Sequence, residues 1–199
     1  MKYEKIRDSL KTGDVLLFEG KGFFSWVIKR ATGSRNSHIG IVYRPAAEVV
    51  LTAESTTLST VKDYFKDRKV KGVQFVSLSE RIRTYKGKIW VRQLARPMTA
   101  DERAAFEEAR EEFKDRKYEQ SVWQLIRAGF KWKLQKEDLS SLFCSEFITV
   151  LFKRIGYLLK NRFPSNEINP WDYGWQRLID EEMALAGKNR LMVPIRLEK

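Results

Sequence analysis

The chain contains one cysteine and one histidine, and thiol chemistry needs both residue types. Cys144 lies near the start of the segment from Leu142 to Gly156. The helix N-cap residues Ser140 and Ser141 come just before this segment, apolar residues follow at helical spacing, and Gly156 is a natural stop. A helix N-terminus carries about half a positive charge, which stabilises a thiolate. The pattern therefore predicts a helix whose first turn points a nucleophilic thiol into the protein.

His38 begins a predicted strand within the segment Ser37 to Tyr43, and a polar stretch over 33–37 leads into it. At the mouth of a strand its side chain can reach into a cleft. An imidazole beside a thiol takes the thiol proton and then protonates the leaving group. Each residue also has an ordinary alternative. A buried cysteine is often a small hydrophobe, and a single histidine often has a structural role.

A catalytic imidazole needs a third group that fixes its tautomer and steadies its charged form. A second strand is predicted over 48–54, after Arg44 and Pro45. A hairpin between the two strands would bring Glu54 back beside His38. Glu54 is therefore the candidate for the third group. Glu48, near the far end of the hairpin, is the weaker candidate, and a solvated glutamate at a strand end is the alternative reading of Glu54.

Four motifs occur in an order that resembles a known superfamily. In chain order they are Gly13-Asp-Val-Leu-Leu-Phe18, Ser37-His-Ile-Gly-Ile-Val-Tyr43, Phe143-Cys-Ser-Glu-Phe147 and Asn169-Pro-Trp-Asp172. They resemble the permuted papain-like branch of the NlpC-type cysteine peptidases, typified by YiiX and YaeF and related to the lecithin:retinol acyltransferase-like enzymes. Papain-like chains normally place the cysteine first, whereas here the histidine precedes it by 106 positions (144 − 38). The resemblance covers about residues 10 to 175.

This resemblance implies an α+β, papain-like fold of the permuted NlpC type, with an antiparallel sheet packed against the cysteine-bearing helix. It implies a cysteine peptidase or amidase that cleaves amide bonds, including those of cell-wall peptides, through a thioester on Cys144 and without a cofactor. The family places a polar residue on the strand after the histidine, which fits Glu54. The acyltransferase relatives keep lipid esters open as substrates of a lipid acyltransferase or phospholipase. A catalytically inactive binding module on the same fold is a further alternative.

Two other residues are weaker candidates for contacts with the substrate or the oxyanion. Tyr118 begins a segment, 118–134, in which aromatic and cationic side chains alternate, and related enzymes use this region to wall the site. Asp14 precedes the first strand, where capping its own turn is the alternative role. One histidine and one cysteine cannot form a zinc site without several carboxylates, so no metal is expected.

The rest of the pattern predicts a single domain over 1–199. Strands are expected at 14–19, 73–78, 89–94 and 191–197. Helical segments are expected at 22–31, within 58–68, at 79–85, from the capping box of Thr99 and Glu102 to about 116, and at 172–182.

The chain is strongly basic, with a net charge of +12 and a sequence pI of about 9.8. Such an excess favours an anionic partner, such as nucleic acid, membrane headgroups or wall polymers. Nucleic-acid-binding motifs are missing, so no specific nucleic acid is expected. Neither a transmembrane run nor a signal peptide is apparent, which makes cytoplasmic synthesis the default expectation, with later release or export left open.

Overall fold

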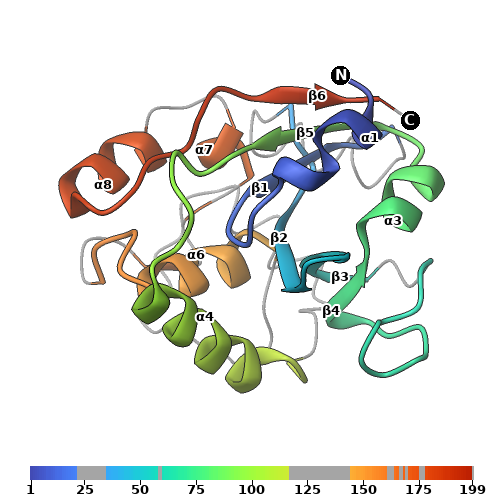
Figure 1. Ribbon diagram of the computed structural model, residues 1–199, viewed down its shortest axis with the longest axis horizontal. Coiled ribbons are helices and arrows are strands. Elements are labelled where there is room, and N and C mark those ends of the chain that lie inside the picture. The colour runs from blue at the N-terminus through green and yellow to red at the C-terminus, as the bar shows by residue number, and fades with distance from the viewer. Residues whose placement is uncertain are drawn as a thin grey trace.

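The computed structural model describes residues 1–21, 35–57, 60–116, 144–160, 164–165, 168, 170–174 and 178–198. Within these residues the framework is a six-stranded antiparallel sheet in the order β4-β3-β2-β1-β5-β6 (Figure 1). The strands are β1 (Val15–Glu19), β2 (His38–Ala46), β3 (Val49–Thr56), β4 (Gly72–Ser77), β5 (Lys88–Arg92) and β6 (Ile195–Leu197).

Helices cover both faces of this sheet. They are α1 (Tyr3–Ile6) with the 3-10 turn η1 (Arg7–Ser9), α3 (Leu78–Thr84), α4 (Ala100–Phe113), α6 (Cys144–Arg154), α7 (Pro170–Gly174) and α8 (Leu178–Ala186). Figure 1 shows α4 and α6 together at the lower left, β3 and β4 at the lower right, and α1 near the edge strand β6 at the top. The cysteine-bearing helix α6 packs against β2 and β3, as the sequence predicts.

The alternation of side chains along β1 divides the interior into two cores. Val15 and Leu17 join one core with α4 and α6, whereas Leu16 and Phe18 join another with α1 and α3. Successive strand residues point to opposite faces, so a strand covered on both sides needs an unbroken apolar run. This requirement explains the sequence Val-Leu-Leu-Phe in β1, whose residues are all fully buried.

Helix α6 is buried from Cys144 to Lys153. Its apolar stripe at Phe147, Ile148 and Leu151 lies in the core, in agreement with the prediction from spacing. The helix ends before Gly156, whose φ of +78° is in the left-handed region that glycine adopts without a steric penalty. The N-cap positions expected at Ser140 and Ser141 lie outside the described residues.

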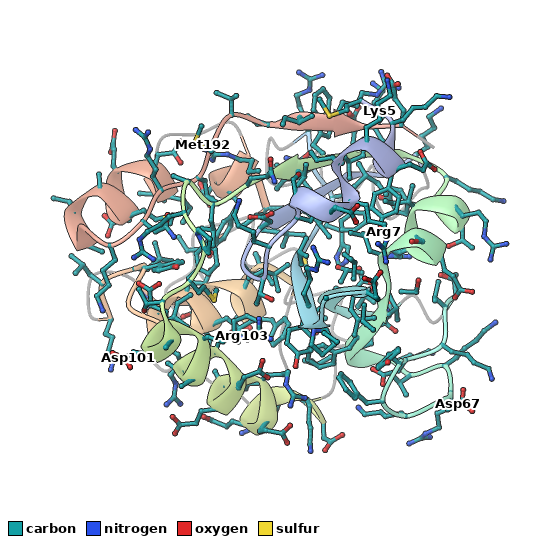
Figure 2. All side chains as sticks on the ribbon, in the orientation of Figure 1. Lys5, Arg7, Asp67, Asp101, Arg103 and Met192 are labelled. Atoms are coloured by element: carbon teal, nitrogen blue, oxygen red, sulfur yellow. The ribbon has the colours of Figure 1, made fainter. Side chains whose placement is uncertain are left out.

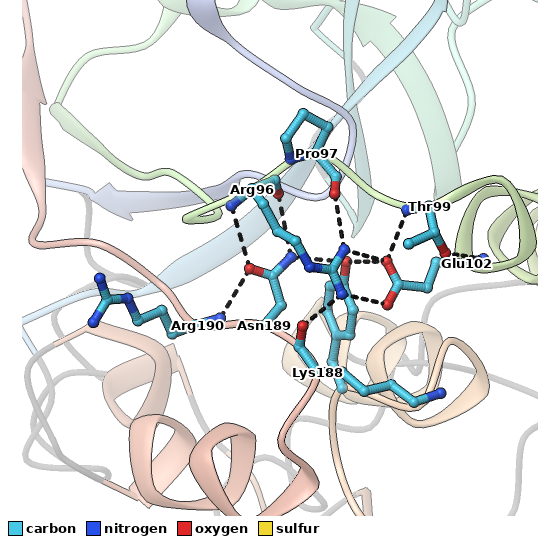
Figure 3. Close-up of polar contacts among 8 residues, drawn as sticks. Arg96, Pro97, Thr99, Glu102, Lys188, Asn189 and Arg190 are labelled. Carbon is cyan, nitrogen blue, oxygen red and sulfur yellow. Dashed lines mark hydrogen bonds and ion pairs between the residues drawn. The ribbon is translucent and has the colours of Figure 1, made fainter.

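Helix α4 is held to the rest of the fold by polar contacts at its start. The predicted capping box is present, because Thr99 Oγ1 accepts from the Glu102 N–H and Glu102 Oε2 accepts from the Thr99 N–H. Glu102 also binds Arg96 through both carboxylate oxygens and accepts from the Tyr157 hydroxyl at 2.9 Å (Figure 3). Farther along α4, Arg103 donates to Thr12 Oγ1 at 2.6 Å (Figure 2).

Most of the predicted strands and the helices at 79–85 and 99–116 are confirmed. The helix expected within 58–68 is wrong for its described part, 60–68, which forms turns. Asp63 explains the difference, because its carboxylate accepts from the N–H groups of Phe65, Lys66 and Phe75 and so stabilises a turn against β4. Of the helix predicted at 172–182, residues 172–174 lie in α7 and residues 178–182 in α8, and residues 175–177 lie outside the described residues. The helix expected at 22–31 lies outside the described residues.

No helix in the described part of the chain is both long enough and apolar enough to cross a membrane.

Candidate active site

His38 is the first residue of β2, and its imidazole lies against a buried carboxylate. The Nε2 atom of His38 lies 2.6 Å from Oε2 of Glu54 on β3. Ile41 pairs with Ala53, so the ladder places Glu54 opposite Gly40, and a Cβ built at Gly40 would lie 3.5 Å from the Glu54 Cβ. His38 therefore meets Glu54 diagonally across the strand pair, within the reach of two long side chains. The predicted hairpin does bring these residues together.

The carboxylate of Glu54 is fully buried, and donors from two further elements bind it. Gln74 on β4 donates from Nε2 to Oε1 at 2.8 Å. Arg81 on α3 donates from Nη2 to Oε2 at 3.2 Å, and its Nε makes an ion pair with Oε1 at 3.1 Å. Charge-assisted contacts of this kind compensate the cost of burying a carboxylate.

Arg81 and Gln74 carry no motif, and sequence reasoning missed both. Arg81 is only 1% exposed, and its guanidinium carbon lies 5.3 Å from the ring centroids of both Phe18 and Tyr85. Helix α3 brings it there because Ser77 caps the helix and the apolar neighbours Leu78 and Ile82 turn the same face toward the sheet. The sequence signal that could have identified Arg81 is its position among the apolar residues Leu78 and Ile82 on the buried face of α3.

Cys144 is the first residue of α6, and its side chain is 8% exposed. It belongs to the core on the α6 face, whereas Arg81 packs against Phe18 of the other core. His38, at the start of β2, contacts Glu54 directly, and the charge of Cys144 acts on its ring. With Nε2 directed at Glu54, Nδ1 is the ring nitrogen left for the thiol.

Burial and the two acidic neighbours act in opposite directions on the imidazole. Burial lowers the pKa of His38, but the charges and hydrogen bonds of Cys144 and Glu54 outweigh this effect and raise the pKa to about 9. Burial would raise the pKa of Glu54, but the charge of Arg81, followed by that of His38, lowers it to about 2. The site therefore favours a charged imidazolium held against a charged carboxylate.

The two weaker candidates do not join this cluster. Asp14 lies at the opposite end of β1 from Phe18, which pairs with His38. Its carboxylate accepts from the N–H groups of Lys11 and Leu94, so the structure assigns it the turn-capping role. Burial raises the pKa of Asp14 to about 6, against the effect of these two donors. Tyr118 lies outside the described residues.

Among the described residues, no group of three or more His, Cys, Asp or Glu side chains could hold a metal ion. The carboxylate of Glu54 is already bound by Arg81, Gln74 and His38. The donor set around the cysteine and histidine therefore does not match a metal site.

No protein-family model matches the chain, and no curated protein matches it. Among solved structures it is similar to the crystal structure of metalloprotein YiiX from Escherichia coli O157:H7, DUF1105, with a TM-score of 0.52 and 18% sequence identity. The chain has a YiiX-like fold. The match covers 73% of this chain and 66% of the YiiX chain, so just under two thirds of YiiX is represented. The resemblance predicted from the motif order is thus confirmed at the level of the YiiX-like fold.

Proposed function

We propose that this protein is a thiol hydrolase of the amidase or peptidase type. Cys144 is the nucleophile, His38 is the general base and then the general acid, and Glu54 orients His38. The observation that carries the proposal is the 2.6 Å contact between the single histidine and a buried carboxylate, made by a ring whose pKa the charge of the single cysteine raises. A thiol is activated when a base lies beside it and a third group orients that base, as proposed here for Cys144, His38 and Glu54.

In the first half-reaction, His38 accepts the thiol proton and the thiolate attacks the carbonyl carbon of an amide. The carbonyl π electrons move to its oxygen and form a tetrahedral oxyanion. The N–H of Cys144 lies at the start of α6, where helical N–H groups have no partner within the helix, and it serves as one oxyanion donor. When the oxyanion collapses, the C–N bond breaks and the amine leaves with the proton from His38.

The second half-reaction consumes the thioester. His38 removes a proton from water, the resulting hydroxide attacks the thioester carbonyl, and the C–S bond breaks. The acid leaves, and Cys144 recovers its proton from His38. Water as the acyl acceptor makes the protein a hydrolase, whereas another nucleophile at the same step would make it an acyltransferase.

YiiX is named a metalloprotein, but the proposed mechanism routes no step through a metal. A metal ligated by Glu54 would have to displace the guanidinium of Arg81, which contacts both of its oxygens. The substrates proposed are peptide amides, including those of cell-wall peptides. The charge of +12 favours substrates presented on an anionic surface.

The test is the pH dependence of alkylation by iodoacetamide, compared between the native protein and His38→Ala. The single cysteine makes every label assignable to Cys144. The expected result is rapid alkylation well below pH 8 that His38→Ala abolishes. A panel of peptide amides and lipid esters then identifies which donor forms a thioester on Cys144. Alkylation of Cys144 with the midpoint of an ordinary thiol would overturn the proposal.

A further inference from the structure

We propose that Arg81 is a positioning residue for this site: its guanidinium fixes the Glu54 carboxylate against the imidazole of His38, and so sets the state in which His38 meets Cys144. The inference rests on the proposed function and adds a residue that has no contact with the substrate. Arg81 acts on the thiol through two intermediates, Glu54 and His38.

The geometry supports a dedicated role for the guanidinium. Arg81 contacts both oxygens of Glu54, with an Nε–Oε1 distance of 3.1 Å and an Nη2–Oε2 distance of 3.2 Å, and so shares Oε2 with the imidazole of His38. Its side chain is 2% exposed and that of Glu54 is fully buried, so solvent does not screen the pair. The rings of Phe18 and Tyr85 lie 5.3 Å from the guanidinium carbon and restrict where it can sit.

Charge balance gives Arg81 its effect on the thiol. In the activated state the cluster holds a thiolate, an imidazolium, a carboxylate and a guanidinium, and these four charges sum to zero. Without Arg81 the same state would carry a buried net charge of −1. Removal of a buried cation raises the pKa of an acid near it, so Glu54 would retain a proton to higher pH and would no longer hold His38 as an imidazolium. The charge of Arg81 is also the largest influence that lowers the pKa of Glu54.

A purely structural role is the competing explanation. Buried ion pairs contribute little to stability compared with well-packed apolar residues, so an ion pair at this position needs another reason. Gln74, a neutral residue, already donates a hydrogen bond to Oε1 of Glu54 at 2.8 Å. Arg81 supplies a positive charge that Gln74 does not, and this charge keeps Glu54 the carboxylate that pairs with His38.

The experiment measures the midpoint of the pH–alkylation curve of Cys144 in Arg81→Gln and Arg81→Lys. Arg81→Gln removes the charge and retains a donor toward Glu54, and its midpoint is expected to rise by about one pH unit or more. Arg81→Lys retains the charge and is expected to recover most of the native midpoint. Circular dichroism establishes that each variant is folded, and trimethylamine N-oxide restores the fold where it is lost.

Arg92→Gln is the matched control. Arg92 is also a buried arginine, 4% exposed, but it binds Asp180 and backbone carbonyls and lies on β5, separated from β2 by β1. Its substitution is expected to lower the melting temperature and leave the alkylation midpoint unchanged. A change of midpoint in Arg92→Gln equal to that in Arg81→Gln would show general destabilisation and overturn the inference.

Failure of this inference is separable from failure of the proposed function. If native Cys144 is activated and folded Arg81→Gln has the same midpoint, the role of Arg81 is rejected and the thiol hydrolase stands. If native Cys144 already reacts as an ordinary thiol, both are rejected.

Discussion

His38 and Glu54 make their 2.6 Å contact from diagonal positions on two neighbouring strands. His38 is the first residue of β2, the strand on which α6 packs, and its buried ring lies between Glu54 and Phe18. Because Glu54 is ionised, it accepts a hydrogen bond, and Nε2 must carry a hydrogen. The tautomer that leaves Nδ1 as the base toward the thiol is therefore fixed by β3.

Glu54→Gln is expected to impair both stability and thiol activation. The variant leaves Arg81 buried without its anion, and breaking one side of a buried pair costs about 3–5 kcal/mol of unfolding free energy. The folded pKa of Glu54, about 2, is below its ordinary value of 4.5. Its stabilising contribution is therefore present above pH 4.5 and is lost as the pH falls toward 2. Urea denaturation from pH 2 to pH 7 should show the two proteins converging at the acid end.

Glu48→Gln is the matched control for this prediction, because Glu48 lies on the same hairpin and is exposed. Its effect on unfolding free energy and on the alkylation midpoint of Cys144 should be near zero. Equal losses in Glu48→Gln and Glu54→Gln would show that Glu54 has no special relationship with His38.

Hydrolysis and alkylation should separate at alkaline pH. Alkylation needs only the thiolate, so its rate should remain high above pH 9. Hydrolysis also needs the imidazolium that protonates the leaving amine, and the pKa of His38 is about 9. The rate of amide hydrolysis should therefore fall above about pH 9 while alkylation does not. A parallel decline of the hydrolysis and alkylation rates would indicate alkaline unfolding. If both rates stayed constant above pH 9, His38 would not be the general acid.

The elements that carry Cys144, His38 and Glu54 could be predicted from local sequence, whereas the packing of α6 on β2 and β3 followed from the family resemblance. Cys144 precedes an apolar helical stripe, His38 begins a strand, and a hairpin of short connection sets the register that returns Glu54 to His38. Each of these signals spans fewer than about 20 residues, within the reach of pattern reasoning. That these three groups act in catalysis stays a prediction.

The surroundings of Glu54 could not be predicted in the same way. Gln74 and Arg81 reach the carboxylate only through the pairing of β4 with β3 and the packing of α3 on that pair. Their effect depends on tertiary distance, which hydrophobic periodicity does not encode. The turn at 60–68 was missed for a related reason, since Asp63 binds the N–H of Phe75 twelve residues away.

Tyr157→Phe should destabilise the fold without affecting the thiol. The hydroxyl of Tyr157 donates to Glu102 and accepts from Asn189, each at 2.9 Å, and so links the start of α4 to the C-terminal segment (Figure 3). Loss of a buried bridging hydroxyl costs about 1–3 kcal/mol. Thermal denaturation should show the loss, with an unchanged alkylation midpoint for Cys144. A variant as stable as the native protein would mean that Arg96 and the Thr99 N–H suffice for Glu102.

Gly156→Ala should destabilise the C-terminal end of α6 more than Gly187→Ala destabilises the end of α8. Both glycines have positive φ, +78° and +68°, and a left-handed conformation costs a residue with a Cβ about 1–2 kcal/mol. A Cβ at Gly156 would lie 2.9 Å from Lys188 Nζ, whereas one at Gly187 would have nothing within 4 Å. The side chain of Lys188 can move away from the new Cβ. The extra loss of unfolding free energy in Gly156→Ala should therefore be smaller than the loss in Gly187→Ala. Because Gly156 lies at the end of α6 opposite to Cys144, alkylation should be unaffected in both variants. If Gly156→Ala altered the alkylation midpoint, the two ends of α6 would be coupled, and the thiol would depend on more than the local contacts of His38.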